Sequence, residues 1–166
     1  MFELRPLSKE AVGEALEKAE RYRLLNEPSL AESICLDILN VEPEHQRALT
    51  TLLLSLTDQF PNRLSEAFRE ALETVPRLEG EYARVYYEGL IWERRAEALH
   101  NRNAPGAAHQ AYDEFRRALE LYRRAIDLRP EGNEEAILRW NTCVRILERD
   151  PQLHEGPGDT FQPLLE

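Results

Sequence analysis

The chain has 166 residues, of which 42% are hydrophobic and 31% charged, the composition of a folded globular protein rather than a disordered one. Its formal net charge of −10 argues against non-specific attraction to nucleic acid or to an anionic membrane as the main activity. No apolar run approaches the roughly 18 residues of a membrane span, and the start MFELRPLSKE lacks the apolar stretch of a signal peptide. We therefore expect a single-domain cytoplasmic protein.

Helical periodicity predicts a first antiparallel pair of helices over about residues 8–25 and 29–41. Ser29, with Glu32 three residues later, is predicted to cap the second helix. Pro43 then prevents its continuation, because proline lacks an amide hydrogen. One apolar face runs along each helix, made by Ala11, Ala15, Ala19 and Tyr22 on the first and by Leu30, Ile34, Ile38 and Val41 on the second.

A second pair repeats this pattern, with a turn predicted at Phe60-Pro61-Asn62 and an end before Pro76. The two terminating prolines, Pro43 and Pro76, are 33 positions apart. The apolar faces of the second pair are Ala48, Leu49, Leu52, Leu53 and Leu56, followed by Leu64, Ala67, Phe68, Ala71 and Leu72.

A longer helical hairpin is predicted next, with its tip at Asn103-Ala104-Pro105-Gly106 and its end at Pro130. A last helix, over about residues 133–149, is predicted to begin at an Asn133 cap and to cover the end of the preceding pair. The two arms of the hairpin carry Tyr82, Val85, Gly89, Trp92, Ala96 and Leu99, and then Ala111, Phe115, Ala118, Tyr122 and Ala125.

These features resemble the tetratricopeptide repeat family. The likeness lies in a period close to 34 residues, small side chains where paired helices touch, and a closing proline. It extends over about residues 10–43, 44–76 and 79–130, although Leu52 and Ser55 depart from the small and aromatic residues usual there. The resemblance implies an all-α fold, a right-handed α-solenoid of antiparallel helix pairs with an elongated third hairpin. One domain over 8–149 would then lie between an N-terminal extension, 1–7, and a flexible C-terminal tail, 150–166.

The sequence offers no pattern typical of catalysis, metal binding or cofactor binding. Its four histidines are scattered, and Cys35 and Cys143 are 108 positions apart, so neither set has the spacing of metal ligands. Phosphate-cradling and serine-nucleophile motifs do not occur. Both cysteines fall within apolar helical patterns, where free, buried thiols are expected. We therefore expect a protein without enzymatic activity, metal or cofactor.

The resemblance also implies a concave groove, lined by the first helix of each repeat, that binds a peptide of another protein. An alternative for Tyr86 and Tyr87 is that they fill the core of the long hairpin. The clamp by which related co-chaperones hold the C-terminal carboxylate of heat-shock chaperones is absent, since its positions hold Leu16, Glu20, Thr50, Ala83 and Tyr87. Carried over by position, the groove comprises Leu16, Glu20, Arg23, Leu49, Thr50, Leu53, Tyr86, Tyr87, Leu90, Arg94, Arg139 and Arg145.

The sequence thus favours a non-enzymatic, bacterial adaptor whose partner is a protein or peptide rather than a nucleic acid or membrane. One alternative is a specialised chaperone for a single hydrophobic client, similar to the translocator chaperones of type III secretion. Another is a self-associating module or homodimer, in which the apolar tail segment from Phe161 to Leu165 docks in the groove.

Overall fold

The computed structural model describes residues 1–157, and within these residues all regular structure is helical. This confirms the expected all-α class. Two short 3₁₀ segments, η1 (Lys9–Ala11) and η2 (Val75–Arg77), accompany the α-helices. The seven α-helices of this part of the chain are α1 (Val12–Leu24), α2 (Pro28–Val41), α3 (Gln46–Asp58), α4 (Phe60–Thr74), α5 (Glu81–His100), α6 (Ala107–Leu128) and α7 (Glu135–Arg149).

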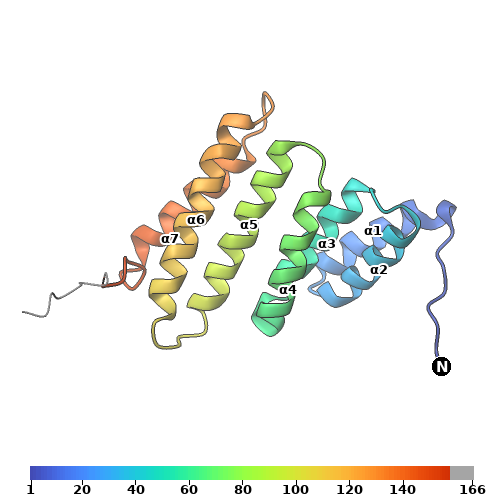
Figure 1. Ribbon diagram of the computed structural model, residues 1–166, viewed down its shortest axis with the longest axis horizontal. Helices are drawn as coiled ribbons and strands as arrows, with labels where there is room; N and C mark the ends of the chain where they lie inside the picture. The colour runs from blue at the N-terminus through green and yellow to red at the C-terminus, as the bar shows by residue number, and fades with distance from the viewer. Residues whose placement is uncertain (158–166) are drawn as a thin grey trace, which may run out of the picture.

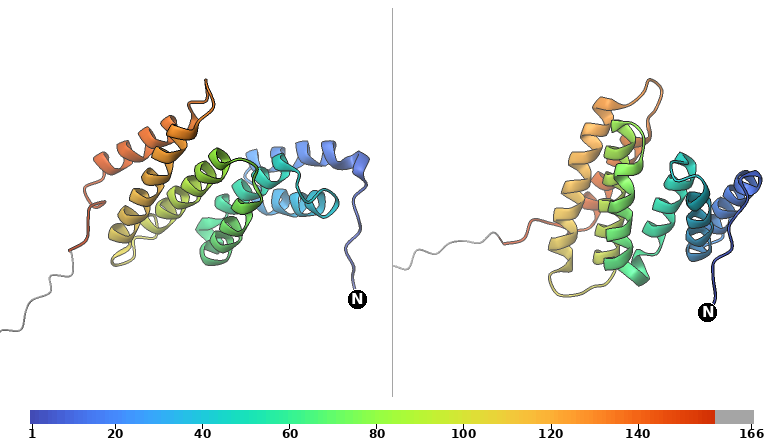
Figure 2. Two further views of the ribbon diagram at one scale, coloured as in Figure 1. Left: turned by 45° about the horizontal axis from the view of Figure 1, so that its top comes forward. Right: turned by 45° about the vertical axis from the view of Figure 1, so that its right-hand side comes forward.

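Successive helices pack against one another in chain order. Figure 1 shows them following the long axis of the molecule, from α1 and α2 at one end to α6 and α7 at the other, and Figure 2 shows the same order from two more sides. Besides these neighbours, α1 contacts α3, α3 contacts α5, and α5 contacts α7. The first helices of successive pairs therefore share one side of the molecule.

Prolines end the helices where the sequence predicted. Helix α2 stops at Val41, two residues before Pro43, and α6 stops at Leu128, two residues before Pro130. Pro76 lies inside the 3₁₀ turn η2 that follows α4. The hairpin tip lies between α5 and α6, as predicted, and contains the left-handed residues Asn103 and Gly106.

Two local predictions at helix starts were wrong. Helix α2 begins at Pro28, and its N-cap residue Glu27 makes no side-chain capping bond, so Ser29 is an exposed residue inside the first turn. Proline suits the first helical position because its ring already holds a helical φ there. The predicted turn from Phe60 to Asn62 belongs to α4 itself, and the chain bends one residue later, at the non-helical Arg63 (φ −133°, ψ 43°).

The N-cap residue of α7 is Glu134, one position after the predicted Asn133, and it makes no side-chain capping bond; Asn133 nevertheless bonds the first helical amide. Asn133 Oδ1 accepts from the backbone N–H of Glu135 at 3.1 Å, which satisfies one free amide at the start of α7. The same oxygen accepts a hydrogen bond from the Tyr82 hydroxyl at 3.2 Å. Asn133 thus ties the beginning of α7 to the beginning of α5.

Two clusters of buried side chains form the core. One joins α1–α4 to the inner side of α5, and the other joins α5, α6 and α7. Alanine lies where neighbouring helices approach, because a small side chain allows close packing. Fully buried alanines are Ala19, Ala31, Ala48, Ala67, Ala71, Ala96, Ala111, Ala118, Ala125 and Ala136.

The packed part of the chain extends beyond residue 149, where the sequence placed the start of the tail. Asp150 pairs with His100 Nε2 at 2.6 Å, and Leu153 is buried in the second core cluster. His109 Nδ1 lies 3.1 Å from the carbonyl oxygen of His154. Residues 150–154 therefore lie against the tip of the long hairpin. The predicted tail segment 161–165 falls outside the described residues.

Candidate functional site

Two adjoining hollows lie on the side of the molecule that α1, α3 and α5 share. The first, here the central hollow, has a volume of about 510 Å³. The second, the end hollow, lies toward the C-terminal ends of the same helices and has a volume of about 400 Å³. The central hollow is lined by Glu20, Arg23, Leu24, Arg47, Thr50, Thr51, Leu54 and Tyr87. The end hollow is lined by Arg23, Leu24, Asn26, Thr57, Asp58, Phe60, Pro61, Arg94, Glu97, Ala98 and Asn101.

Arg23 and Leu24 line both hollows, which therefore adjoin at these two residues and are together called the groove. Leu24 is 81% exposed. It lies between the two hollows, and an apolar side chain in this position offers a contact to anything that occupies them.

Three arginine–carboxylate pairs line the groove. Arg47 Nη2 contacts both carboxylate oxygens of Glu20, at 2.8 and 3.0 Å. Arg23 Nε lies 2.7 Å from Asp58 Oδ2 and so joins α1 to the end of α3. The third pair, Arg94 with Glu97, is looser, at 3.8 Å between Nη1 and Oε2. The groove therefore carries balanced charge in a protein whose overall charge is −10.

Tyr87 provides the aromatic wall of the central hollow. Its side chain is half-buried and packs against both core clusters, while its ring meets that of Tyr86 edge-on at 5.0 Å. Burial raises the pKa of Tyr87 above its ordinary value, although a hydrogen bond with Thr50 opposes the shift. The phenol therefore stays neutral and presents an amphipathic surface.

The structure brings five of the predicted groove residues together at these hollows: Glu20, Arg23, Thr50, Tyr87 and Arg94. Five others are core residues that leave almost no surface for a partner: Leu16, Leu49, Leu53, Tyr86 and Leu90. For Tyr86, core packing was the alternative that the sequence left open.

The last two predicted residues lie on α7, away from both hollows. Arg145 is exposed. Arg139 Nη1 lies 3.3 Å from the carboxylate of Glu93, which is fully buried and also accepts a hydrogen bond from the Tyr122 hydroxyl. Burial lowers the pKa of Arg139, but the charge of Glu93 outweighs it and holds that pKa above its usual range. Arg139 therefore fastens α7 to the long hairpin.

Sequence reasoning missed several residues of the groove. Leu24 and Leu54 each lie four positions after a predicted groove residue, Glu20 and Thr50. Residues four apart share a helix face, so this spacing could have identified both. Glu97 lies three positions after the predicted Arg94 on the same helix and could have been found in the same way, whereas Asp58 gave no such signal.

The chain matches no family model, no curated protein and no solved structure.

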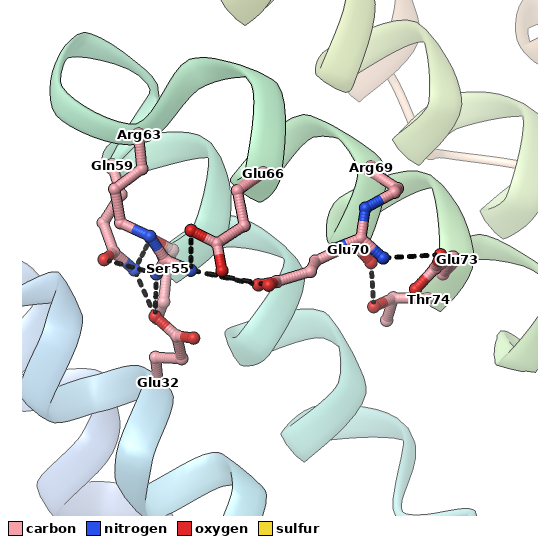
Figure 3. A network of polar contacts seen from close by, with 9 residues as sticks. All are labelled: Glu32, Ser55, Gln59, Arg63, Glu66, Arg69, Glu70, Glu73 and Thr74. Carbon is pink, nitrogen blue, oxygen red and sulfur yellow. Dashed lines mark hydrogen bonds and ion pairs between the residues drawn. The ribbon is translucent and has the colours of Figure 1, made fainter.

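A separate polar network lies where α2, α3 and α4 meet (Figure 3). Arg63 Nη1 lies 3.0 Å from Glu32 on α2, and Nη2 lies 3.4 Å from Glu66 and from Glu70 on α4. Gln59 donates to Glu32 at 2.6 Å and accepts from Arg63 at 3.0 Å. One guanidinium thus joins two helices at the bend of α4.

Two negative findings apply to residues 1–157. No group of three or more histidine, cysteine or acidic side chains is arranged to hold a metal ion. No helix in the same range is long and apolar enough to cross a bilayer.

Proposed function

We propose that this protein is a tetratricopeptide-like adaptor without enzymatic activity, which binds a peptide segment of a partner protein in the groove on α1, α3 and α5. The helix pairs would stack as a right-handed α-solenoid, whose first helices line the concave side. The contacts of α1 with α3 and of α3 with α5 support this arrangement, as does the 33-residue spacing of Pro43 and Pro76.

The observation that carries the proposal is the meeting of Glu20, Arg23, Thr50, Tyr87 and Arg94, from three helices, at two adjoining hollows. Their side chains combine an aromatic face, hydroxyl groups and guanidinium donors. These groups suit a peptide, with its polar backbone, better than they suit a purely apolar client. The three ion pairs that line the groove argue against the chaperone alternative, since a hydrophobic client would desolvate them without replacing their contacts.

Panning a phage-displayed library of random peptides tests the proposal. Leu24→Glu places a charge between the two hollows, and because Leu24 is 81% exposed the change leaves the core intact. Leu25→Glu is the matched control, since Leu25 is 65% exposed and lines neither hollow.

We expect the wild type and Leu25→Glu to enrich the same peptides, and Leu24→Glu to bind them at least about tenfold more weakly, the effect of about 1.4 kcal/mol. The proposal fails if the wild type enriches no peptide. It also fails if Leu24→Glu and Leu25→Glu bind the enriched peptides equally well.

A further inference from the structure

We propose that the end hollow binds the carboxylate of an aspartate or glutamate side chain in the partner peptide, with Arg94 as its anchor, while a neighbouring apolar side chain packs on Leu24, Leu54 and Tyr87 at the apolar part of the central hollow. This inference rests on the proposed function of the groove and specifies the chemistry of its partner. The preferred segment would thus combine one apolar and one acidic residue, a few positions apart.

Arg94 has hydrogen-bonding capacity that the described residues leave unused. Its Nε is buried and has no acceptor among them, and its contact with Glu97 is long, at 3.8 Å. A guanidinium offers five N–H donors in a plane, which a carboxylate matches through two parallel hydrogen bonds. Because Nε itself is buried, the donors that a ligand carboxylate can reach are the Nη groups of Arg94, whose side chain is 31% exposed and whose contact with Glu97 is long.

The acidic groups already present in the end hollow compete weakly for Arg94. Asp58 is engaged by Arg23, at 2.7 Å. Glu97 is the natural competitor, but burial raises the pKa of its carboxyl despite the opposing charge of Arg94. Desolvation thus disfavours the charged form of Glu97. A ligand carboxylate that enters from solvent and binds in plane with the guanidinium can replace the 3.8 Å contact.

The rim of the end hollow supplies further donors. Asn26, at the end of α1, and Asn101, at the end of α5, are exposed and line the hollow. Each side-chain amide carries two N–H donors. The hydroxyl of Thr57 donates to the carbonyl of Leu54 at 2.9 Å and is not free. Each amide also carries an acceptor oxygen, so the rim can donate to a carboxylate, but the charge of Arg94 is what favours an anionic side chain at this point.

The net charge of the protein adds a preference for peptides with one acidic residue over polyacidic peptides. At −10, the protein repels a uniformly acidic segment at long range. One acidic residue beside an apolar one meets little of this repulsion and still reaches Arg94. We therefore expect the groove to select peptides with a single carboxylate at a fixed distance from the apolar anchor, not polyacidic ones.

The test uses peptides enriched from the random library, synthesised with amidated C-termini so that only side-chain carboxylates remain. Each peptide is paired with a version in which its acidic residue is replaced by the neutral amide, Glu→Gln or Asp→Asn. Both are titrated by fluorescence anisotropy against the wild type, Arg94→Gln and the control Arg21→Gln. Arg21 is exposed on α1, lines neither hollow, and its replacement removes the same charge.

We expect the wild type and Arg21→Gln to bind the acidic peptide about tenfold more tightly than its amide version, as for a hydrogen bond to a charged group. Arg94→Gln should bind the two versions equally, and the amide version as tightly as the wild type does, which shows that its groove is intact.

Several results would overturn the inference. If the enriched peptides share no acidic position, or if Arg94→Gln keeps the tenfold preference, the groove binds peptides without this contact and only the proposed function stands. Loss of binding to both versions by Arg94→Gln would mean that Arg94 supports the fold rather than the carboxylate. If the wild type enriches no peptide, the proposed function fails as well.

Discussion

Gly89 on α5 lies so close to Tyr122 on α6 that a Cβ at position 89 would come within 2.9 Å of the ring carbon Cε1. Tyr122 cannot easily give way, because its side chain is fully buried and its hydroxyl donates a hydrogen bond to Glu93. The two long helices of the third hairpin can therefore approach this closely only with glycine at position 89.

We expect Gly89→Ala to destabilise the protein by about 1 kcal/mol, because the clash, about 1–3 kcal/mol, outweighs the gain of about 1 kcal/mol in helix propensity. Gly13→Ala on α1 is the control, since a Cβ at position 13 would meet nothing within 4 Å, and this variant should gain about 0.5–1 kcal/mol. Urea unfolding measures both changes. A gain in stability for Gly89→Ala would contradict the close packing of α5 on α6.

Arg139→Gln should cost about 3 kcal/mol, because it leaves the carboxylate of Glu93 buried without its cationic partner. Arg145→Gln removes a similar charge from an exposed site on the same helix, and should change stability by less than about 0.5 kcal/mol. Urea unfolding of the two variants measures both changes in the free energy of unfolding.

A double variant separates the loss of the ion pair from the loss of the packing of the Arg139 side chain. Adding Glu93→Gln to Arg139→Gln removes the buried charge, while the amide oxygen can still accept the hydrogen bond from Tyr122. The double variant should therefore be more stable than Arg139→Gln alone. Equal or lower stability would show that the ion pair is not what holds α7.

Arg63→Gln should destabilise the protein by about 1–2 kcal/mol, since it removes charge-assisted hydrogen bonds between α2 and α4. Burial lowers the pKa of Arg63, but Glu32 and then Glu66 and Glu70 outweigh it, so the net shift is upward. The guanidinium is therefore held more strongly in the folded than in the unfolded chain.

The control for Arg63 is Arg69→Gln on the same helix. Among residues 1–157, Arg69 pairs only with Glu73, at 3.2 Å, and both side chains are mostly exposed, so its loss should cost no more than about 0.5 kcal/mol. Thermal unfolding at low and high salt compares the stability costs of Arg63→Gln and Arg69→Gln. A cost for Arg63→Gln that disappears in high salt would indicate an ordinary surface pair.

The helix ends could be predicted because they depend on single residues. Pro43, Pro76 and Pro130 act locally, through a missing amide hydrogen and a fixed φ, and each marks the end of a helix. The start of α2 was misplaced because Pro28 and Ser29 are both good starting residues. The sequence does not show which of them enters the helix.

The candidate site could be predicted only in part, because the rotation of each helix about its axis is fixed by tertiary packing. On α3, Thr50 and Leu54 line the central hollow, whereas Leu49 and Leu53, one position earlier in each case, are buried. One residue corresponds to about 100° around a helix, so a small error in rotation exchanges groove and core positions. The pairs Arg23–Asp58 and Arg47–Glu20 join different helices and leave no periodic signal.

The thiol of Cys35 gives the last prediction, a loss of stability at alkaline pH. Burial, and next the charges of Glu20 and Glu32, raise the pKa of this thiol to about 12. Burial and then Glu93 raise the pKa of Cys143 as well. In the unfolded chain a thiol ionises near about pH 8.5. The unfolded state therefore loses protons first as the pH rises.

Because the thiol pKa is higher in the folded than in the unfolded state, the free energy of unfolding falls as the pH rises. The stability that each neutral, buried thiol provides is fully present below about pH 8.5, and for Cys35 it is lost as the pH rises toward about 12. The slope of the unfolding free energy against pH approaches about 1.4 kcal/mol per unit for each thiol.

Urea unfolding of the wild type and of Cys35→Ala between about pH 7 and pH 10 measures this slope, and Cys35→Ala should show a shallower one above about pH 9. The thiol-specific reagent DTNB should label neither cysteine in the folded protein and both after unfolding, because the thiolate is the reactive form. Equal slopes for the two proteins, or rapid labelling of folded protein, would show that these thiols are not held neutral in the core.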